Sequence, residues 1–317
     1  MQANAKISIA IAAYNGGKYI AEQLASLLAQ TRLPDEIIIC DDSADELTFQ
    51  AVQEFLPCNI IRYTKNLEPL GVARNFEKAL SLTSGEYIFL CDQDDVWLPG
   101  KVESLAAVLD KNKDIDGVFC NSILVDEKLE PLDKTLWELR NFTPAMQKML
   151  AGGNALEVFC RRVVCSGHNI AVRRRALEYI MPFPELAPFY PDTWIALAVA
   201  LNSNMQMCNE LLTLYRIHDS NRSNPAGSLW QSARRSRNNS AAARNSMLAE
   251  ELLQRSKSAD PARRKMVENF TLHHRNRSLY SKNIFVRTGQ MFIELCTFRY
   301  SKYSNGWRTF AADMIFR

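Results

Sequence analysis

Strand-like apolar segments and amphipathic helical patterns alternate through the first 91 residues, and this alternation constrains the fold more than any other feature of the sequence. Three helical patterns, at 18–30, 45–55 and 71–82, separate four apolar segments. Those segments have the Ile-rich character of strands that are covered on both faces. They are Lys6 to Ala13, Glu36 to Cys40, Asn59 to Thr64 and Glu86 to Cys91. Such alternation predicts a parallel α/β sheet with right-handed crossovers, which binds ligands beyond the carboxyl ends of its strands.

Two of those strand ends carry acidic clusters. Asp41 and Asp42 follow the second strand, and the run Asp92-Gln93-Asp94-Asp95 follows the fourth. Carboxylates are hard oxygen ligands that suit Mg²⁺ or Mn²⁺, and such an ion would bridge the diphosphate of a nucleotide. An acidic loop that only caps the next helix is the alternative, because a short acidic motif also arises by chance.

The regular alternation of strands and helices ends after a predicted helix at 101–109. Residues 116–125 and 163–172 read as strands with a loop-rich insert between them, 192–201 as a helix, and 206–217 as holding a short strand. From residue 228 onward the chain reads as helical and basic. We therefore expect a catalytic domain over 1–222, with a donor half at about 6–109 and an acceptor half at about 110–222, followed by a helical extension over 223–317.

The charge is divided unevenly along the chain. Residues 221–317 hold 18 Lys and Arg against 6 Asp and Glu, a charge of +12, whereas the first 220 residues carry −9. Basic helices with aromatic and aliphatic faces are typical of proteins that bind anionic membranes, although a solvated helical face would look the same. Charge alone also permits nucleic-acid binding, but no nucleic-acid motif accompanies it, and we expect none.

The sequence shows no signal peptide and no apolar run close to the roughly 20 residues that a membrane span needs. An apolar share of 47% and a charged share of 23% are ordinary for a soluble globular protein. We therefore predict a cytoplasmic protein that is not integral to a membrane.

Four segments carry a family resemblance. They are AAYNGGKYIAEQLASLLAQT, EIIICDDS, GVARNFEKAL and GEYIFLCDQDDVWLP, in this order. Their order and spacing resemble the family 2 glycosyltransferases, closely over residues 6–109 and more weakly beyond. The resemblance implies a GT-A fold, a divalent metal (Mg²⁺ or Mn²⁺) and a UDP-, dTDP- or GDP-linked sugar donor. The DQDDVW variant resembles rhamnosyl-, galactosyl- or glucosyltransferases of bacterial surface polysaccharides. This implies a glycan or lipid-linked glycan acceptor, with the enzyme peripheral on the inner face of the cell membrane.

The resemblance also implies residue roles. Tyr14 would stack on the nucleobase, Asp42 would hydrogen bond to it with Asp41 sharing the contact, and Asp94 would be the principal metal contact. His218, after a Tyr-Arg-Ile stretch, would be a metal ligand or a diphosphate contact, with a structural role as the alternative. The donor nucleotide would be bound by Ala12, Tyr14, Asp41, Asp42, Arg74, Asp92 and Gln93. The sugar and acceptor side would hold Asp95, Gly167, His168 and Asn169.

Asp192 is the predicted catalytic base. A sugar transfer with inversion needs a group that accepts the proton of the attacking hydroxyl. In the resembled family this is an acidic residue that opens a helix well downstream of the metal motif, and Asp192 matches it. Pro191 departs from the pattern, since it stands where an acidic residue is commoner. A helix N-cap is the alternative role for Asp192.

Two other classes of protein remain as alternatives. A nucleotidyltransferase would also use acidic metal ligands on an α/β sheet, but the segment from Ala12 to Gly17 lacks its Gly-rich phosphate loop with a basic residue. A non-catalytic nucleotide-sugar-binding or assembly module is the second. The presence of Asp42, Asp94 and Asp192 together argues against it.

Overall fold

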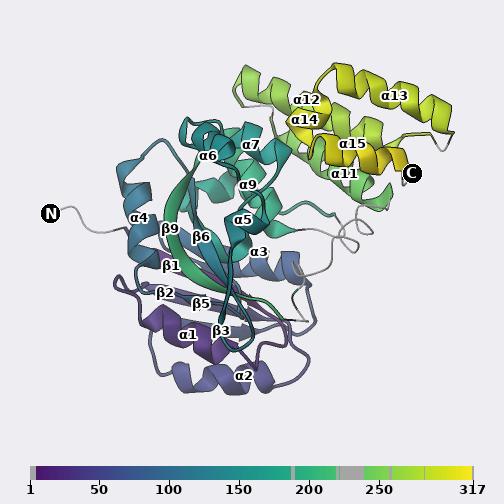
Figure 1. Ribbon diagram of the computed structural model, residues 1–317. Helices are drawn as coiled ribbons and strands as arrows, with labels where there is room; N and C mark the ends of the chain where they lie inside the picture. The colour runs from purple at the N-terminus through teal and green to yellow at the C-terminus, as the bar shows by residue number, and fades with distance from the viewer. Residues whose placement is uncertain are drawn as a thin grey trace.

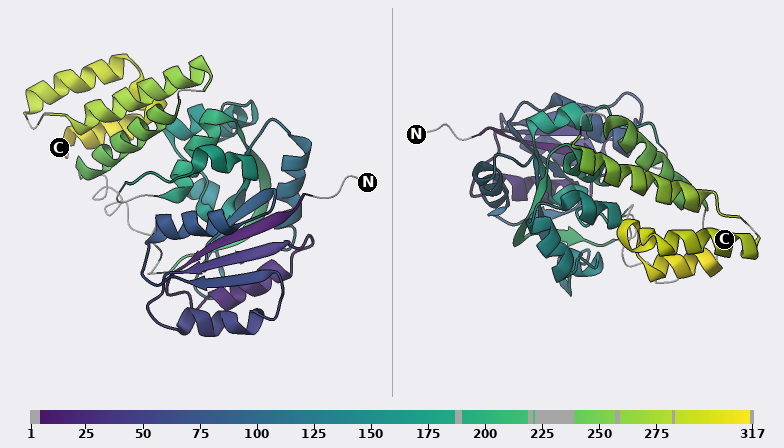
Figure 2. Two further views of the ribbon diagram at one scale, coloured as in Figure 1. Left: turned by 180° about the vertical axis from the view of Figure 1, so that it is seen from behind. Right: turned by 90° about the horizontal axis from the view of Figure 1, so that it is seen from above.

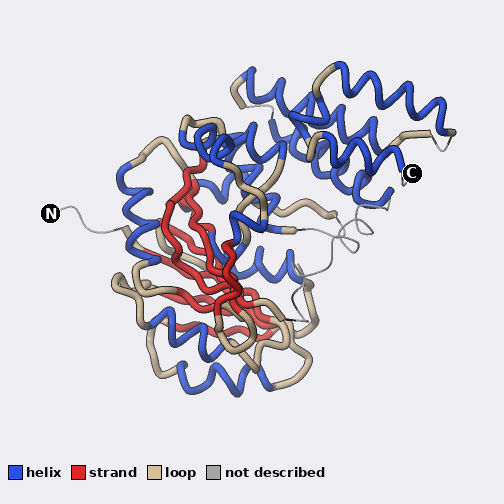
Figure 3. Tube along the Cα trace, in the orientation of Figure 1, coloured by secondary structure: helices blue, strands red, loops and turns tan. Residues whose placement is uncertain are grey.

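A computed structural model describes residues 5–186, 190–218, 221, 239–256, 259–281 and 283–315. Within these residues the strands form one nine-stranded mixed sheet in the order β3-β2-β1-β4-β8-β6-β9-β5, with β7 paired to β6 (Figures 1 and 3). The strands are β1 (Ile7–Ala13), β2 (Glu36–Asp41), β3 (Ile61–Lys65), β4 (Tyr87–Cys91), β5 (Val96–Trp97), β6 (Gly117–Val125), β7 (Pro131–Thr135), β8 (Ile170–Arg173) and β9 (Met205–Arg216).

The first half is the predicted parallel sheet. Strand β1 pairs in parallel with both β2 and β4, and β2 pairs in parallel with β3. The connecting helices and turns are α1 (Ile20–Leu28), α2 (Leu47–Val52), η1 (Gln53–Phe55), α3 (Val72–Leu82) and α4 (Lys101–Lys111). The fold class expected from the alternation is therefore confirmed.

The second half departs from the expected strands. The segment 163–172 was predicted to be one strand, but only Ile170–Arg173 (β8) is a strand, and Gly167–Asn169 (η2) is a 3-10 turn. The backbone N–H of Ser166 donates to Oδ1 of Asn169 at 2.9 Å, which folds the chain back before the strand begins. Strand β8 lies antiparallel between β4 and β6. The short strand expected within 206–217 is instead the 12-residue β9.

Helices cover both faces of the sheet, and the side chains of each strand alternate between the two cores. Ile7, Ile9 and Ile11 of β1 belong to the core under α1 and α4. Ala10, from the same strand, belongs to the core on the opposite face, under α3 and α9 (Pro191–Asn202). The other elements on and around the sheet are α5 (Leu136–Leu139), α6 (Pro144–Ala151), α7 (Ala155–Arg161), η3 (Arg174–Ala176) and α8 (Leu177–Ile180).

The C-terminal helices form a separate layer against α7 and α9 (Figure 2). They are α11 (Asn239–Arg255), α12 (Pro261–Ser278), α13 (Ile284–Cys296), α14 (Arg299–Tyr303) and α15 (Trp307–Ile315). In the part of the chain that the structure describes, no helix is long and apolar enough to cross a membrane. The predicted boundary at 222/223 lies outside the described residues, so the division into two domains stays a prediction.

Candidate active site

A cleft of about 400 Å³ opens where β1 and β4 end, with the start of α9 on its other side. Seven of the predicted site residues line it: Ala12, Tyr14, Asp92, Gln93, Asp94, Gly167 and Asp192. The strands deliver the first five because parallel strands present their carboxyl ends at one edge of the sheet. Residues predicted for the donor, the metal and the base thus share one cavity.

Gln93 joins the loop after β4 to the loop after β1. Its Oε1 accepts from the backbone N–H of Tyr14 at 2.9 Å, and its Nε2 donates to the Tyr14 carbonyl at 2.8 Å. A Cβ atom on Gly16 would lie only 2.4 Å from this Oε1, so the absence of a side chain there lets Gln93 approach. Tyr14 itself is 52% exposed, which leaves its ring open to the cleft.

Asp94 and His218, the two predicted metal contacts, lie together. Asp94 Oδ2 and His218 Nε2 are 2.9 Å apart. Arg216, at the end of β9, fixes the acidic loop beside them: its Nε donates to the Asp94 carbonyl at 2.9 Å, and its backbone N–H donates to Asp95 Oδ1 at 3.0 Å. The strand that leads to His218 therefore also holds the acidic loop in place. Metal binding by this pair remains a prediction.

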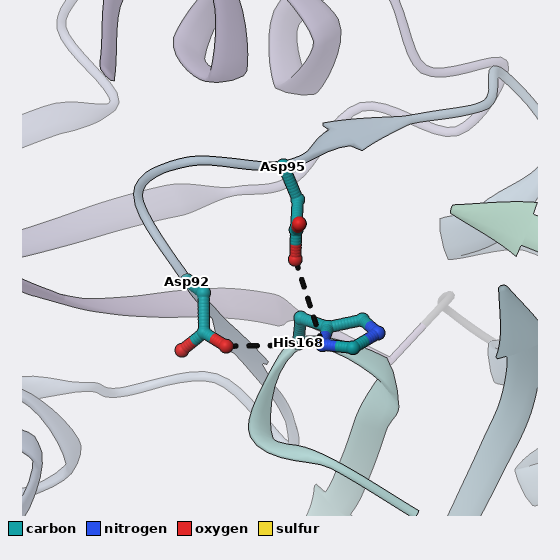
Figure 4. A group of neighbouring side chains, drawn as sticks. All are labelled: Asp92, Asp95 and His168. Atoms are coloured by element: carbon teal, nitrogen blue, oxygen red, sulfur yellow. Dashed lines mark ion pairs between the residues drawn. The ribbon is translucent and has the colours of Figure 1, made fainter. Parts of the chain in front are cut away.

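Asp92 of the cleft lining also belongs to a second group of potential ligands, together with Asp95 and His168 (Figure 4). His168 Nδ1 is 3.7 Å from Asp92 Oδ2 and 3.5 Å from Asp95 Oδ2. Asp95 Oδ2 and His168 Nδ1 are both buried and have no hydrogen-bond partner. Both residues were predicted on the sugar and acceptor side, whereas their side chains are fully buried. A carboxylate oxygen and an imidazole nitrogen that lack hydrogen-bond partners and lie close together could both be ligands of a bound cation. The nitrogen suits Mn²⁺ better than Mg²⁺.

Burial sets the protonation of this group. It lowers the pKa of His168 to about 3, with the nearby Lys101 ammonium as the second cause, so the imidazole is neutral. Burial, followed by the charge of Asp94, raises the pKa of Asp92 to about 7 and that of Asp95 well above its usual range. His168 Nε2 lies 2.9 Å from Ser122 Oγ; if it carries the ring proton, Nδ1 is free to bind a cation.

Lys101 is a buried cation beside this group that the sequence analysis missed. Its Nζ donates to the His168 carbonyl at 2.5 Å and to Thr213 Oγ1 at 2.8 Å. The ammonium also lies 3.7 Å from the centre of the Trp97 ring. Burial lowers the pKa of Lys101. Nothing in the sequence marked Lys101, since a lysine at the start of a predicted helix is ordinarily exposed.

Asp192 lines the cleft without capping its helix. Helix α9 begins at Pro191, its N-cap residue is Tyr190, and no side chain caps it. Asp192 Oδ1 instead accepts from the backbone N–H of Thr193 at 2.6 Å. The N-cap alternative is therefore wrong. Burial raises the pKa of Asp192, and the charge of Arg140 opposes that shift.

Arg140 is a cleft residue that the sequence analysis also missed. It follows α5, in an insert that carries no motif, and brings a cation to a cleft whose other charged lining residues are the carboxylates Asp92, Asp94 and Asp192. One guanidinium nitrogen donates to Ser166 Oγ at 3.3 Å, while Nε is buried with no partner. Among the described residues no carboxylate lies within 4.0 Å of it. The remaining lining residues are uncharged: Val72, Phe76, Leu90, Tyr190, Pro191, Thr193, Tyr215 and Asn221.

Asp41 and Asp42 lie beneath the donor side with their oxygens engaged. Asp41 accepts from the Tyr63 hydroxyl at 2.6 Å and from the backbone N–H of Ser43 at 2.9 Å. Asp42 accepts from the backbone N–H groups of Leu70 and Gly71, at 3.1 and 2.8 Å, and thereby fixes the loop before α3. Their contacts with a nucleobase remain predictions.

Arg74 and Asn169 do not line the cleft. Arg74 pairs with Glu77 and, at 3.1 Å, with Glu185. The Asn169 side chain is fully buried, and its Nδ2 donates to the Cys120 carbonyl at 2.8 Å. The structure thus gives both side chains protein partners, and their roles toward substrate remain predictions.

The mixed sheet with an acidic cleft at its strand ends is a GT-A fold, which the solved structures below share. The model of the family described as glycosyl transferase family 2 matches residues 8–181, which is more than half of the chain. The chain belongs to this family, and the resemblance seen in the sequence is confirmed. The family also decides against the nucleotidyltransferase alternative.

Two relatives illustrate the match. An uncharacterized glycosyltransferase of Nostoc sp. is 30% identical over 225 residues, which cover 68% of this chain and 66% of the relative. An uncharacterized glycosyltransferase of Bacillus subtilis is 38% identical over 102 residues, 32% of this chain and 37% of the relative. The chain thus spans less than two thirds of the length of either relative.

Solved structures agree on the fold. Staphylococcus aureus TarS (residues 1–349) in complex with UDP-GlcNAc is similar with a TM-score of 0.60 at 17% identity, over 98% of this chain and 88% of that one. The mannosyltransferase PcManGT of Pyrobaculum calidifontis, in complex with GDP-Man and Mn²⁺, gives a TM-score of 0.57 at 16% identity, over 99% and 87%. At these identities the likeness concerns the fold alone.

Proposed function

We propose that this protein is an inverting, metal-dependent hexosyl- or deoxyhexosyltransferase. It takes the sugar from a UDP-, dTDP- or GDP-linked donor and transfers it to a glycan or lipid-linked glycan during bacterial surface polysaccharide synthesis. The observation that carries this proposal is the shared cleft, because Asp192 lines the same cavity as the strand-end residues Asp92 and Asp94. A base and a metal-binding loop on two sides of one cavity suit displacement at a carbon between them.

The donor side would be held by the ends of β1 and β4. The exposed Tyr14 ring would stack on the nucleobase, and Gln93 keeps that ring's loop against the acidic loop. Asp94 with His218, and Asp92 with Asp95 and His168, are the two sets of residues that would hold Mn²⁺ or Mg²⁺. The divalent ion would neutralise the charge of the departing nucleoside diphosphate.

The acceptor side would be served by Asp192. Its carboxylate takes the proton of an acceptor hydroxyl as the hydroxyl oxygen bonds to the anomeric carbon. The bond from that carbon to the diphosphate oxygen breaks on the opposite side, and the configuration inverts. Arg140 faces the same space and favours the ionised, proton-accepting form of Asp192.

We place the enzyme in the cytoplasm, peripheral on the inner face of the membrane. The charge of +12 over residues 221–317 supports this location, because the anionic lipids of that face attract a basic surface. Residues 1–222 would then catalyse the transfer, and residues 223–317 would hold the enzyme near a lipid-linked acceptor.

A thermal-shift screen tests the donor and metal assignments together. UDP, dTDP, GDP and their sugar conjugates are added with and without MnCl₂. We expect one nucleotide to raise Tm only with metal, by an amount equivalent to about 2.7 kcal/mol when the ligand is present at a hundred times its Kd. Asp94→Asn should fold normally but lose this shift and the turnover of the donor-sugar conjugate. A folded variant that keeps full turnover at every metal concentration would show that Asp94 is not a ligand.

A further inference from the structure

Helix α13 turns its charged side chains inward and its apolar side chains outward. Arg287, Met291 and Glu294 recur at helical spacing on one face, and all three are buried. The opposite face presents Phe285 and Phe292, which are 85% and 63% exposed. A helix on the surface of a soluble protein normally has the reverse arrangement, with its apolar stripe toward the core.

The inward face is fixed by specific contacts. Glu294 accepts from Asn276 Nδ2 at 2.7 Å and from the Arg299 guanidinium at 3.0 Å, and it lies 2.7 Å from His273 Nδ1. The Arg287 guanidinium donates to the Met314 carbonyl at 3.2 Å. Rotating the helix to hide its phenylalanines would strip these buried charges of their partners, which is costly. The apolar face is therefore held outward.

That outward face carries no charge. Besides the two phenylalanines it contains only uncharged residues, all exposed: Ile284, Thr288, Gly289, Ile293 and Cys296. Leu279 before the helix and Phe298 directly after it are each 68% exposed as well. Contiguous exposed apolar surface of this kind marks an interaction site.

The surroundings of the helix are basic. Residues 269–315 contain two carboxylates, and both are buried in ion pairs: Glu294 with Arg299 and Asp313 with Arg277. Three exposed cations are Arg275, Lys302 and Arg308. The described surface of this stretch thus offers cations and apolar groups but no carboxylate, which complements an anionic partner that has an apolar interior.

We propose that the outward face of α13 inserts into the interface of an anionic lipid bilayer, with Phe285 and Phe292 as its apolar anchors. This rests on the proposed membrane location and adds that apolar insertion, beyond charge attraction, holds the protein there. Thirteen helical residues span about 20 Å, too short for the roughly 30 Å hydrocarbon core, so the helix lies along the interface. A symmetric pair of chains fits this face less well, because it would bring the same cations of both copies together.

Vesicle flotation of the full chain tests the proposal, with phosphatidylcholine vesicles that contain or lack phosphatidylglycerol, at low and high salt. The test variant is Phe285→Ser with Phe292→Ser. The matched control is Leu33→Ser with Leu67→Ser, which removes two side chains of 57% and 103% exposure from the catalytic domain. Cys296, the only exposed cysteine of the eight, accepts an environment-sensitive fluorophore on the outward face itself.

The wild type and the leucine control should float with anionic vesicles and keep part of their binding at high salt, and the Cys296 label should brighten. The phenylalanine variant should lose about ten-fold or more in partitioning. Equal binding by that variant, or complete release of the wild type by salt, would overturn the inference. So would vesicle-free dimers that the phenylalanine substitutions dissociate, since a second copy would then cover the face.

Donor hydrolysis without vesicles separates this inference from the proposed function. The phenylalanine variant should release nucleoside diphosphate at the wild-type rate. If the wild type binds vesicles as expected but turns over no nucleotide sugar, the proposed transfer fails while the lipid contact stands. If turnover proceeds without salt-resistant vesicle binding, the lipid contact fails while the transfer stands.

Discussion

Replacing Asp192 by Asn removes the proposed base while changing little else. The amide keeps the shape of the side chain, and its oxygen can still accept from the backbone N–H of Thr193. No helix cap is lost, because Asp192 does not cap α9. The substitution therefore separates basicity from structure.

The expected loss follows from the role of the carboxylate. General-base catalysis contributes about 10²-fold or more, so kcat should fall by at least that factor, equivalent to about 2.7 kcal/mol. Stability should hardly change. The folded-state pKa of Asp192 is raised, so its ionisation at neutral pH costs the folded state free energy, and Asn removes that cost. Loss of a negative charge from the first helical turn acts the other way, by about 0.3–1 kcal/mol.

The assay compares steady-state turnover, donor affinity by calorimetry, and Tm. Glu178→Gln is the matched control, since it removes an exposed first-turn carboxylate from α8. We expect Asp192→Asn to lose turnover with donor affinity nearly unchanged. A collapse of donor affinity with normal single-turnover transfer would make Asp192 a donor contact instead. Unchanged kinetics would mean that the base lies elsewhere.

Two further substitutions test the cleft. Asp42→Ala should lower the free energy of unfolding by about 1–3 kcal/mol, because it removes the carboxylate that accepts from the buried Asn66 side chain and from the backbone N–H groups of Leu70 and Gly71. Chemical denaturation measures this, and an unchanged stability with a raised donor KM would make Asp42 a nucleotide contact alone. Arg140→Gln should move the acidic limb of the kcat/KM profile to higher pH. The Arg140 charge lowers the pKa of Asp192, so its removal raises that pKa, and the base acts only when deprotonated. A profile with an unmoved limb would remove Arg140 from this role.

Local patterns were enough for the first half of the fold. Strands β1 to β4 begin within two residues of the predicted positions, because a strand buried on both faces needs a continuous apolar run wherever it lies in the sheet. Their order along the chain also placed Asp92 and Asp94 at a ligand-binding edge. The family resemblance supplied the pairing of Asp94 with His218, which no local pattern contains.

The sequence by itself determined the sheet class, the position of the acidic loop and the charge division along the chain. Tertiary structure decided what depends on long-range contacts. These are the position of the turn η2, which brings His168 to Asp92 and Asp95, the approach of Arg140 to the cleft, and the outward direction of the apolar face of α13. The hydrophobic periodicity of a sequence indicates that a helix has one apolar and one polar face. Which face is buried depends on the partners that the rest of the chain provides, and for α13 those partners are His273, Asn276 and Arg299, which hold its charged side inward.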